Sequence, residues 1–370
     1  MTAEEFVPRF LRHTQLSQLL LALTRRGYRC IGPQIEDGAI VFRELSDVDE
    51  LPRGVQAIQV PGGYRLAEDK EQRYFAWANG PQALKPWLFA PTEPLWRSVR
   101  SEDGRLNFAE LMPEAKPLAV IGVRACDLAA LALQDAHFMG GPHPNAHYAR
   151  RREGLFVVAV QCAVPAATCF CASTGDGPTP SSGFDLGLAE LREGFVVTAG
   201  SSRGSEVLGE LDLEAAIASQ KEEARRQGEQ AAQMQSRRLP SRNLRQALLD
   251  RLEHPRWNEV ASRCLACGNC TAVCPTCFCH AHEVQPALGG EEADQVRKWD
   301  SCFGESHGQL HGFQVRPDIR SRYRQWLVHK LGTWHEQYGR SGCVGCGRCI
   351  SWCPVGIDIT EEVAALVVDA

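Results

Sequence analysis

The sequence predicts an α/β protein in its N-terminal region, joined by a helical connector to a smaller α+β domain that is rich in cysteine. Three observations carry this prediction. Short apolar runs alternate with helix-forming segments before residue 205, which is typical of a parallel sheet. The stretch 205–255 is charged, favours helix and contains no cysteine. Eight of the 16 cysteines then fall into two matching banks near the C-terminus.

Four segments follow from these observations. They are a mixed α/β region at 1–115, an α/β region with cysteine-bearing loops at 116–204, a helical connector at 205–255 and the cysteine-rich domain at 256–370. In the first segment, leucines at helical spacing predict a helix over 11–26 that ends at Gly27, a natural helix C-cap. The run 39–42 predicts a short strand.

The second segment alternates strands with a helix. The apolar runs 118–123, 155–160 and 195–198 predict strands, and 127–137 predicts a helix. Ligands bind in the loops that follow such strands, and these loops contain four cysteines, named here the loop cysteines: Cys126, Cys162, Cys169 and Cys171. In the third segment, the charged stretch 214–238 predicts a solvated helix.

The two banks share the spacing C-x2-C-x2-C-x3-C-P. The first bank is Cys264, Cys267, Cys270 and Cys274, and the second is Cys343, Cys346, Cys349 and Cys353. Bacterial ferredoxins use this spacing to hold two [4Fe–4S] clusters, and the fourth cysteine of each bank ligates the other cluster. The sequence therefore predicts a ferredoxin-like dicluster domain in which Cys353 completes the first cluster and Cys274 the second. Zinc ribbons also use paired C-x2-C, but zinc does not require the trailing C-x3-C-P.

The remaining cysteines fall into three groups. The loop cysteines would supply four thiolates, and we expect a third [4Fe–4S] cluster there; the alternative is a set of buried thiols around a substrate or partner surface. Cys30 stands alone and is predicted to be a core residue. Three more, named here the insert cysteines, either line the clusters or take a fourth ligand such as His280 or His282: Cys277, Cys279 and Cys302.

Bulk properties narrow the functional class. The net charge is −5 without long runs of one sign, which argues against nucleic acid or an anionic membrane as partner. No apolar run reaches the roughly 18 residues of a membrane span, and the N-terminus lacks a signal-peptide pattern. We therefore expect a cytoplasmic protein, in which cysteines serve as metal ligands rather than disulfides. The chain has neither G-x-G-x-x-G nor G-x-x-x-x-G-K-[ST], so no nucleotide or flavin site is predicted.

The motifs together resemble a known family. The runs CGNCTAVCPTCFC and CVGCGRCISWCPVGIDI, with 299–302 and 320–330 between them, are similar to the beta subunit of cytoplasmic NAD(P)-linked [NiFe] hydrogenases (sulfhydrogenases). The iron–sulfur electron-transfer subunit of anaerobic sulfite reductases has the same pattern. The upstream runs RRGYRCIGP, PGGYRL and GVRACD fit as well, and the run GESHGQLHGFQVRP after Cys302 departs from the pattern.

The resemblance implies an iron–sulfur subunit without a catalytic centre. Such a protein relays electrons between a catalytic partner and a flavin (FAD)- and NAD(P)-binding reductase subunit. The partner implied first is a cytoplasmic [NiFe] hydrogenase, and the alternative is a sirohaem sulfite reductase. A second alternative is a stand-alone iron–sulfur enzyme that acts on a small sulfur compound at the loop cysteines, although the spacing indicates no acid–base set.

Overall fold

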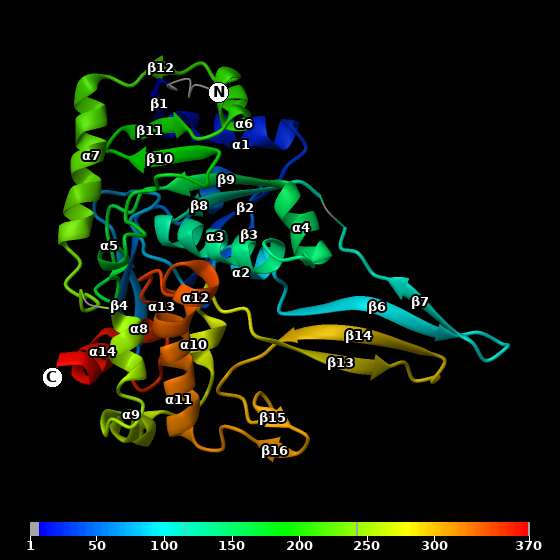
Figure 1. The fold of residues 1–370 in the computed structure, drawn as a ribbon. Helices are drawn as coiled ribbons and strands as arrows, with labels where there is room; N and C mark the ends of the chain where they lie inside the picture. Colours follow the sequence, from blue (N-terminus) through cyan, green and yellow to red (C-terminus); the bar gives the residue numbers. More distant parts are fainter. Residues whose placement is uncertain (1–6, 115, 242, 369–370) are drawn as a thin grey trace.

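The computed structural model describes residues 7–114, 116–241 and 243–368, and within them an eight-stranded mixed sheet forms the centre of the N-terminal part (Figure 1). Its strand order is β12-β1-β11-β10-β9-β8-β2-β3, and the four strands β10, β9, β8 and β2 are parallel to one another. The strands are β1 Arg9–Arg12, β2 Arg29–Glu36, β3 Ala39–Glu44, β8 Leu118–Val123, β9 Leu155–Val160, β10 Leu186–Glu190, β11 Gly194–Ala199 and β12 Glu214–Ala215.

The central strands are buried along their whole length. Every residue of β8 and β9 is buried, as expected for parallel strands that are covered on both faces. Strand β2 pairs with β8, so that Ile31 lies opposite Val120. The segments predicted separately at 1–115 and 116–204 therefore contribute to one sheet and one core.

Helices flank this sheet. They are α1 Leu16–Arg25, α2 Lys85–Leu88, α3 Ala125–Met139, α4 Ala146–Glu153, α5 Cys171–Thr174, α6 Ser202–Gly209 and α7 Ala218–Gln233, with short 3-10 turns at His13–Gln15 and Val48–Glu50. The predicted helix at 11–26 begins only at Leu16, because β1 pairs with β11 and holds Leu11 opposite Phe195. The sheet register overrides helical propensity at this end.

Helix α7 lies along the sheet rather than standing free in solvent (Figure 1). Its Ala224 is buried against Phe10 and Val196, and the side-chain amide of Gln161 donates to the Ala224 carbonyl at 2.7 Å. The charged residues of this helix face outward. The sequence correctly indicated a helix but not that one of its faces is packed.

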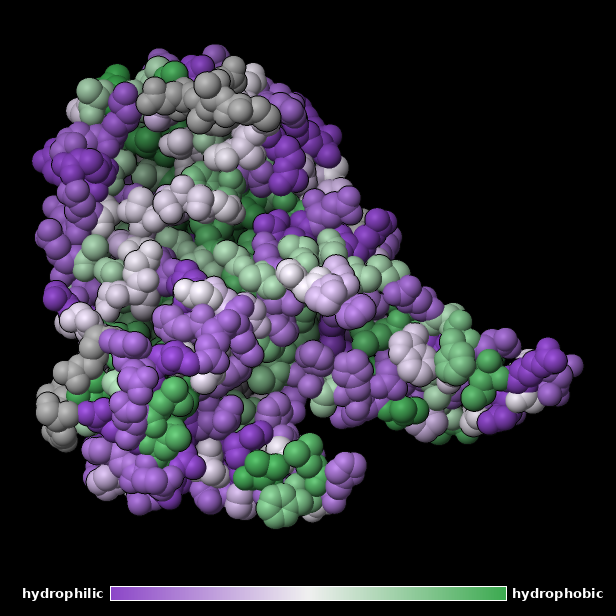
Figure 2. Space-filling model, viewed as in Figure 1, coloured by the Kyte–Doolittle hydropathy of each residue, from purple (hydrophilic) through white to green (hydrophobic). Residues whose placement is uncertain are grey.

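A second, antiparallel sheet projects from the body as an arm (Figure 1). It contains β6 Thr92–Arg100, β7 Leu106–Glu110, β13 His280–Pro286 and β14 Glu292–Trp299 in the order β13-β14-β6-β7. Two hairpins complete the strands: β4 Val55–Val60 with β5 Gly63–Glu68, and β15 Gln309–Leu310 with β16 Phe313–Gln314. Figure 2 shows apolar side chains gathered on the arm and on the β15–β16 hairpin, where Phe108 and Phe313 are exposed.

The cysteine-rich part has its own core. Helices α8 Leu244–Leu249, α9 Arg256–Arg263, α11 Ile319–Val328 and α14 Ile359–Val368 pack around Leu248, Trp257 and Leu327. The other helical elements are α10 Asn269–Ala272, a π-helical segment at His329–Thr333, α12 Trp334–Tyr338 and α13 Arg348–Ser351. The 68-residue insert between the banks, from Cys274 to Cys343, thus supplies half of the arm and helix α11.

Candidate metal centres

The two banks fold into the same local structure. Cys264 caps the end of α9, and Gly268, at φ +76°, starts the single turn of α10. In the second bank Gly347, at φ +75°, starts the single turn of α13. Glycine adopts this left-handed conformation without steric cost. The repeated spacing in the sequence therefore corresponds to a repeated turn.

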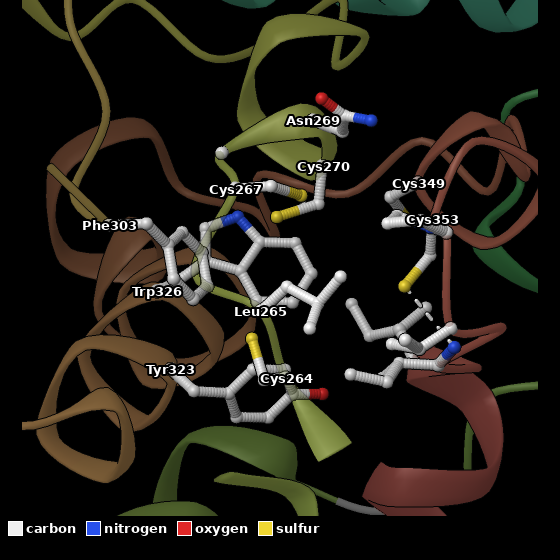
Figure 3. A pocket seen from close by; sticks show the side chains of 15 residues that line it. Cys264, Leu265, Cys267, Asn269, Cys270, Phe303, Tyr323, Trp326, Cys349 and Cys353 are labelled. Carbon is white, nitrogen blue, oxygen red and sulfur yellow. Dashed lines mark hydrogen bonds between the residues drawn. The ribbon is translucent and has the colours of Figure 1, made fainter.

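Five cysteines line one apolar cavity (Figure 3). Three come from the first bank and two from the second: Cys264, Cys267, Cys270, Cys349 and Cys353. Phe303 and, from α11, Tyr323 and Trp326 close the cavity. Helix α11 belongs to the basic stretch between the two banks, and it covers this cavity. These five include the crossed set that the spacing predicts for one cluster, together with Cys349, which the spacing assigns to the other cluster.

The polar atoms around this cavity fit a sulfur-rich group. The backbone N–H groups of Ala266 and Ile357 donate to the sulfurs of Cys264 and Cys353 at 3.4 and 3.3 Å. The indole N–H of Trp326 is buried at the cavity and has no hydrogen-bond acceptor among the described residues. N–H donors that face cluster or thiolate sulfur stabilise added negative charge. A [4Fe–4S] cluster would thus find both its ligands and its donors here.

The second crossed set lies deeper. Burial raises the pKa of the Cys349 thiol, and the sulfurs of Cys343, Cys346 and Cys274 lie close enough to raise it further. Cys274 differs from its neighbours. A hydrogen bond with Cys277 holds the pKa of Cys274 well below its usual range, and the Lys330 ammonium, 3.4 Å from the Cys274 sulfur, acts in the same direction.

The loop cysteines lie beside the second bank. Cys126 is in the first turn of α3, directly after β8, and the others follow β9, so both loops leave the same edge of the sheet. Burial raises the pKa of Cys169, and the nearby sulfurs of Cys162 and Cys171 raise it further. The amide of Gln235 donates to the Cys171 sulfur at 3.3 Å. The four loop cysteines therefore gather at one place, where Cys346 of the second bank is a further neighbour.

Glycines allow the loop cysteines to approach the second bank. The N–H of Phe170 donates to the carbonyl of Gly345 at 2.8 Å. A Cβ at Gly345 would lie 2.5 Å from the backbone nitrogen of Cys171, and one at Gly347 would lie 2.4 Å from the carbonyl oxygen of Thr168. Any other side chain would push the two cysteine-bearing segments apart.

A buried ion pair joins the same two segments. The Nη1 atom of Arg348 lies 2.8 Å from Oδ1 of Asp127, and both side chains are almost fully buried, at 1% and 2% exposure. Asn79 donates to the same carboxylate at 2.8 Å. Asp127, which follows Cys126, is thus the partner of a buried arginine, and the N-cap of α3 is Arg124.

The insert cysteines form a further group. Cys277 lies against Cys274, and Cys279 precedes β13, whose partner β14 ends shortly before Cys302. The histidines considered as fourth ligands turn elsewhere: the ring of His280 packs against Phe89 and that of His282 against His280. His307, five residues after Cys302, contacts the Cys279 thiol instead. The sequence analysis missed His307; the signal that was available is the C-x4-H spacing.

Two general observations complete the picture. Among the described residues, no three His, Cys, Asp or Glu side chains converge on one point as the donors of a single metal ion would. No helix in the same part of the chain has the length and apolar character that crossing a membrane requires. Cys30, predicted to be a core residue, is buried in the main core with 5% exposure.

Comparison with known proteins agrees with this geometry. The 4Fe–4S dicluster domain family matches residues 263–357, and a second 4Fe–4S dicluster family matches residues 224–278. The sulfhydrogenase 2 subunit beta of Pyrococcus furiosus is 32% identical to the chain over 336 residues, which is 89% of this chain and 90% of that protein. The chain belongs to this beta-subunit family. No solved structure matches it.

Membership of the beta-subunit family confirms the resemblance drawn from the motifs. It also confirms that the chain is an iron–sulfur subunit with [4Fe–4S] clusters and an electron-transfer role. The matched dicluster region contains both banks and the insert between them, so the unusual length of the insert does not interrupt the domain.

Proposed function

We propose that the chain relays electrons between the catalytic subunits of a cytoplasmic [NiFe] hydrogenase and a flavin (FAD)- and NAD(P)-binding reductase subunit. The observation that carries this proposal is the succession of cysteine sets. The first cavity reaches the surface at Cys267, which is exposed. Cys349 lines that cavity and belongs to the second set. Cys346, also of the second set, is in turn a neighbour of the loop cysteines. Neighbouring sets of this kind support a row along which electrons pass through the protein.

The ligands that we propose follow the crossed pattern. Three cysteines of the first bank and Cys353 hold one cluster, and three cysteines of the second bank and Cys274 hold the next. A [4Fe–4S] cluster supplies a centre that accepts and gives up one electron at a time. The chain's own residues set the polarity and the charge around each cluster. Trp326 presents its N–H at the first cavity, aromatic rings exclude water there, and Lys330 places a positive charge beside Cys274.

A third [4Fe–4S] cluster at the loop cysteines extends the row in this proposal. Four thiols within one buried loop region match the ligand number of a cluster. Burial disfavours the charged thiolate form of these cysteines unless a positive charge compensates it. The iron of a cluster provides that positive charge. The Gln235 amide at Cys171 and the Asn79 amide, 3.6 Å from the sulfur of Cys126, supply donors to sulfur.

The cluster content is tested on the full chain purified without oxygen. Iron and acid-labile sulfide are measured together with the EPR spectrum after reduction, for the wild type, Cys169→Ser and the matched control Cys30→Ser. We expect Cys169→Ser to lose about four irons relative to both others, since one cluster holds about four. Equal iron in all three proteins would contradict a third cluster at the loop cysteines.

The partners are tested on the complex isolated from cells through a tag on this chain. A [NiFe] hydrogenase partner predicts hydrogen-dependent reduction of NAD(P)⁺ that is lost with Cys270→Ser and kept with Cys30→Ser. If the isolated complex instead reduces sulfite with NAD(P)H, the catalytic partner is a sulfite reductase and not a hydrogenase. An isolated chain that turns over a small sulfur compound by itself would refute the relay.

A further inference from the structure

Cys279, Cys302 and His307 lie together at the base of the projecting arm, and Cys277 precedes Cys279 by two residues. Strands β13 and β14 pair so that His280 lies opposite Trp299, and the N–H of Asp300 donates to the carbonyl of Cys279 at 2.9 Å. This pairing places Cys279 beside the turn that contains Cys302. Burial raises the pKa of the Cys302 thiol to about 12, and the nearby Cys279 acts in the same direction. Cys277 lies on the other side, against Cys274.

His307 is oriented as metal-binding histidines are. Its Nδ1 lies 2.5 Å from Oδ2 of Asp300, while its ring also contacts the Cys279 thiol. A histidine that ligates a metal usually donates its other ring N–H to a carboxylate, which fixes the tautomer and the direction of the free nitrogen. The carboxylate of Asp300 is placed for this purpose, and it leaves Nε2 of His307 for a ligand bond.

Two buried lysines indicate that negative charge gathers between this site and the second bank. Lys85 and Lys330 are 6% and 4% exposed, and neither forms an ion pair with a carboxylate among the described residues. Lys85 Nζ lies 3.3 Å from the carbonyl oxygen of Cys274 and 3.8 Å from the ring centroid of Trp299. Lys330 Nζ is hydrogen-bonded to the sulfur of Cys274 and the hydroxyl of Thr276.

A buried ammonium is costly unless negative charge compensates it. The second bank is adjacent to Lys330. Burial lowers the pKa of Lys85, and the sulfurs of Cys277, Cys274 and Cys279 act against that shift. Clusters held by three or four thiolates carry net negative charge.

We propose that Cys277, Cys279, Cys302 and His307 hold an additional [4Fe–4S] cluster beside the second bank. This inference goes beyond the proposed function, because the new cluster lies beside the row of bank and loop-cysteine clusters and not at one of its ends. The loop cysteines adjoin the second bank at Cys346, whereas the new site adjoins it at Cys274. The second-bank cluster is then a branch point, and the branch leads one electron at a time toward the arm.

The ligand set gives the cluster a spectroscopic signature. The experiment uses the full chain, purified without oxygen, with histidine labelled with ¹⁵N, and measures the nuclear coupling of histidine nitrogen to the reduced clusters by pulsed EPR. We expect the coupling of a directly bound histidine nitrogen in the wild type. The control His311→Ala should show the same coupling, because His311 is exposed at the tip of the β15–β16 hairpin. The coupling should vanish in His307→Cys, while the iron content stays the same because cysteine replaces the ligand.

Cys302→Ser provides an independent measurement. It should lose about four irons while keeping the signals that Cys169→Ser abolishes, since the two variants address different clusters. Absence of a histidine coupling in the wild type would overturn the inference, as would unchanged iron in Cys302→Ser. Zinc that is present in the wild type and lost in Cys302→Ser would also overturn it, because Cys3His is a common structural zinc set. None of these three results would affect the row of the proposed function, which Cys270→Ser and Cys169→Ser test.

Discussion

The ion pair between Arg348 and Asp127 should couple the stability of the two halves of the chain. Both side chains are buried; Nη1 of Arg348 lies 2.8 Å from Oδ1 of Asp127, and Nη2 donates a hydrogen bond of 3.1 Å to Oδ2. Removal of one partner leaves an uncompensated buried charge, which costs about 3–5 kcal/mol. Asp127→Asn and Arg348→Met should each lower the free energy of unfolding by about that amount.

The double variant separates the ion pair from general damage to the core. Asp127→Asn with Arg348→Met leaves no unpaired charge, so the two losses should be non-additive, with the double variant more stable than their sum by about 1–3 kcal/mol. The assay is urea unfolding under anaerobic conditions, followed by circular dichroism and by cluster absorbance. Arg225→Met on the exposed face of α7 is the control and should change nothing measurable.

Two results would refute this reasoning. If either single variant unfolds at the wild-type urea concentration, the buried charge is compensated by groups other than its partner. If the double variant is as unstable as the sum of the two singles, the pair contributes no coupling, and the contact of Arg348 with the carbonyl of Gly80, at 3.0 Å, carries its stabilising effect.

Three further predictions concern single residues. Trp326→Phe removes an N–H donor at the first cavity and should lower the midpoint potential of that cluster in an EPR-monitored titration, with iron content unchanged. Burial lowers the pKa of His137 from 6.5 to about 4. As pH drops through this range, the unfolded chain binds a proton at His137 before the folded chain does, so stability should fall. His137→Phe should flatten that part of the profile of urea midpoint against pH. Gly345→Ala should cost more than the roughly 1 kcal/mol expected for Gly104→Ala, because both have positive φ but only Gly345 faces backbone at 2.5 Å.

Each of these has a result that would count against it. An unchanged potential in Trp326→Phe means that the indole N–H does not reach cluster sulfur. A profile for His137→Phe with the wild-type slope between pH 4 and 6.5 assigns the acid sensitivity to other groups. Equal stability losses for Gly345→Ala and Gly104→Ala would show that the loop at Cys171 shifts freely.

The sequence predicted the local features well, because their causes are local. The continuous apolar runs at 118–123 and 155–160 became the central strands β8 and β9, since buried parallel strands need apolar residues on both faces. The bank spacing encodes a turn and a ligand geometry together, and the dicluster family match confirms the dicluster domain. The glycine directly after the second cysteine of each bank provides the positive φ that this turn requires.

The non-local features were not predictable from the sequence. Nothing in the run 92–100 indicates that it pairs with 292–299, because antiparallel pairing across such a separation leaves no periodic signal beyond that of any strand. The same is true of Arg348, which is an ordinary basic residue in its motif and becomes a buried ion-pair partner only through Asp127. His307 escaped notice because two nearer histidines, His280 and His282, were more obvious candidates.

The pairing of β6 with β14 has a consequence for biogenesis. The arm and the cysteine sites combine residues made early in translation with residues made late: β6 requires β14, and the carbonyl of Pro275 accepts from Gln134 at 2.7 Å. The loop cysteines are synthesised before the residues that pack against them, among which are Gln235 and Gly345. The proposed crossed set of the first cluster is complete only when Cys353 has left the ribosome, so a carrier that loads nascent chains would find that site unfinished.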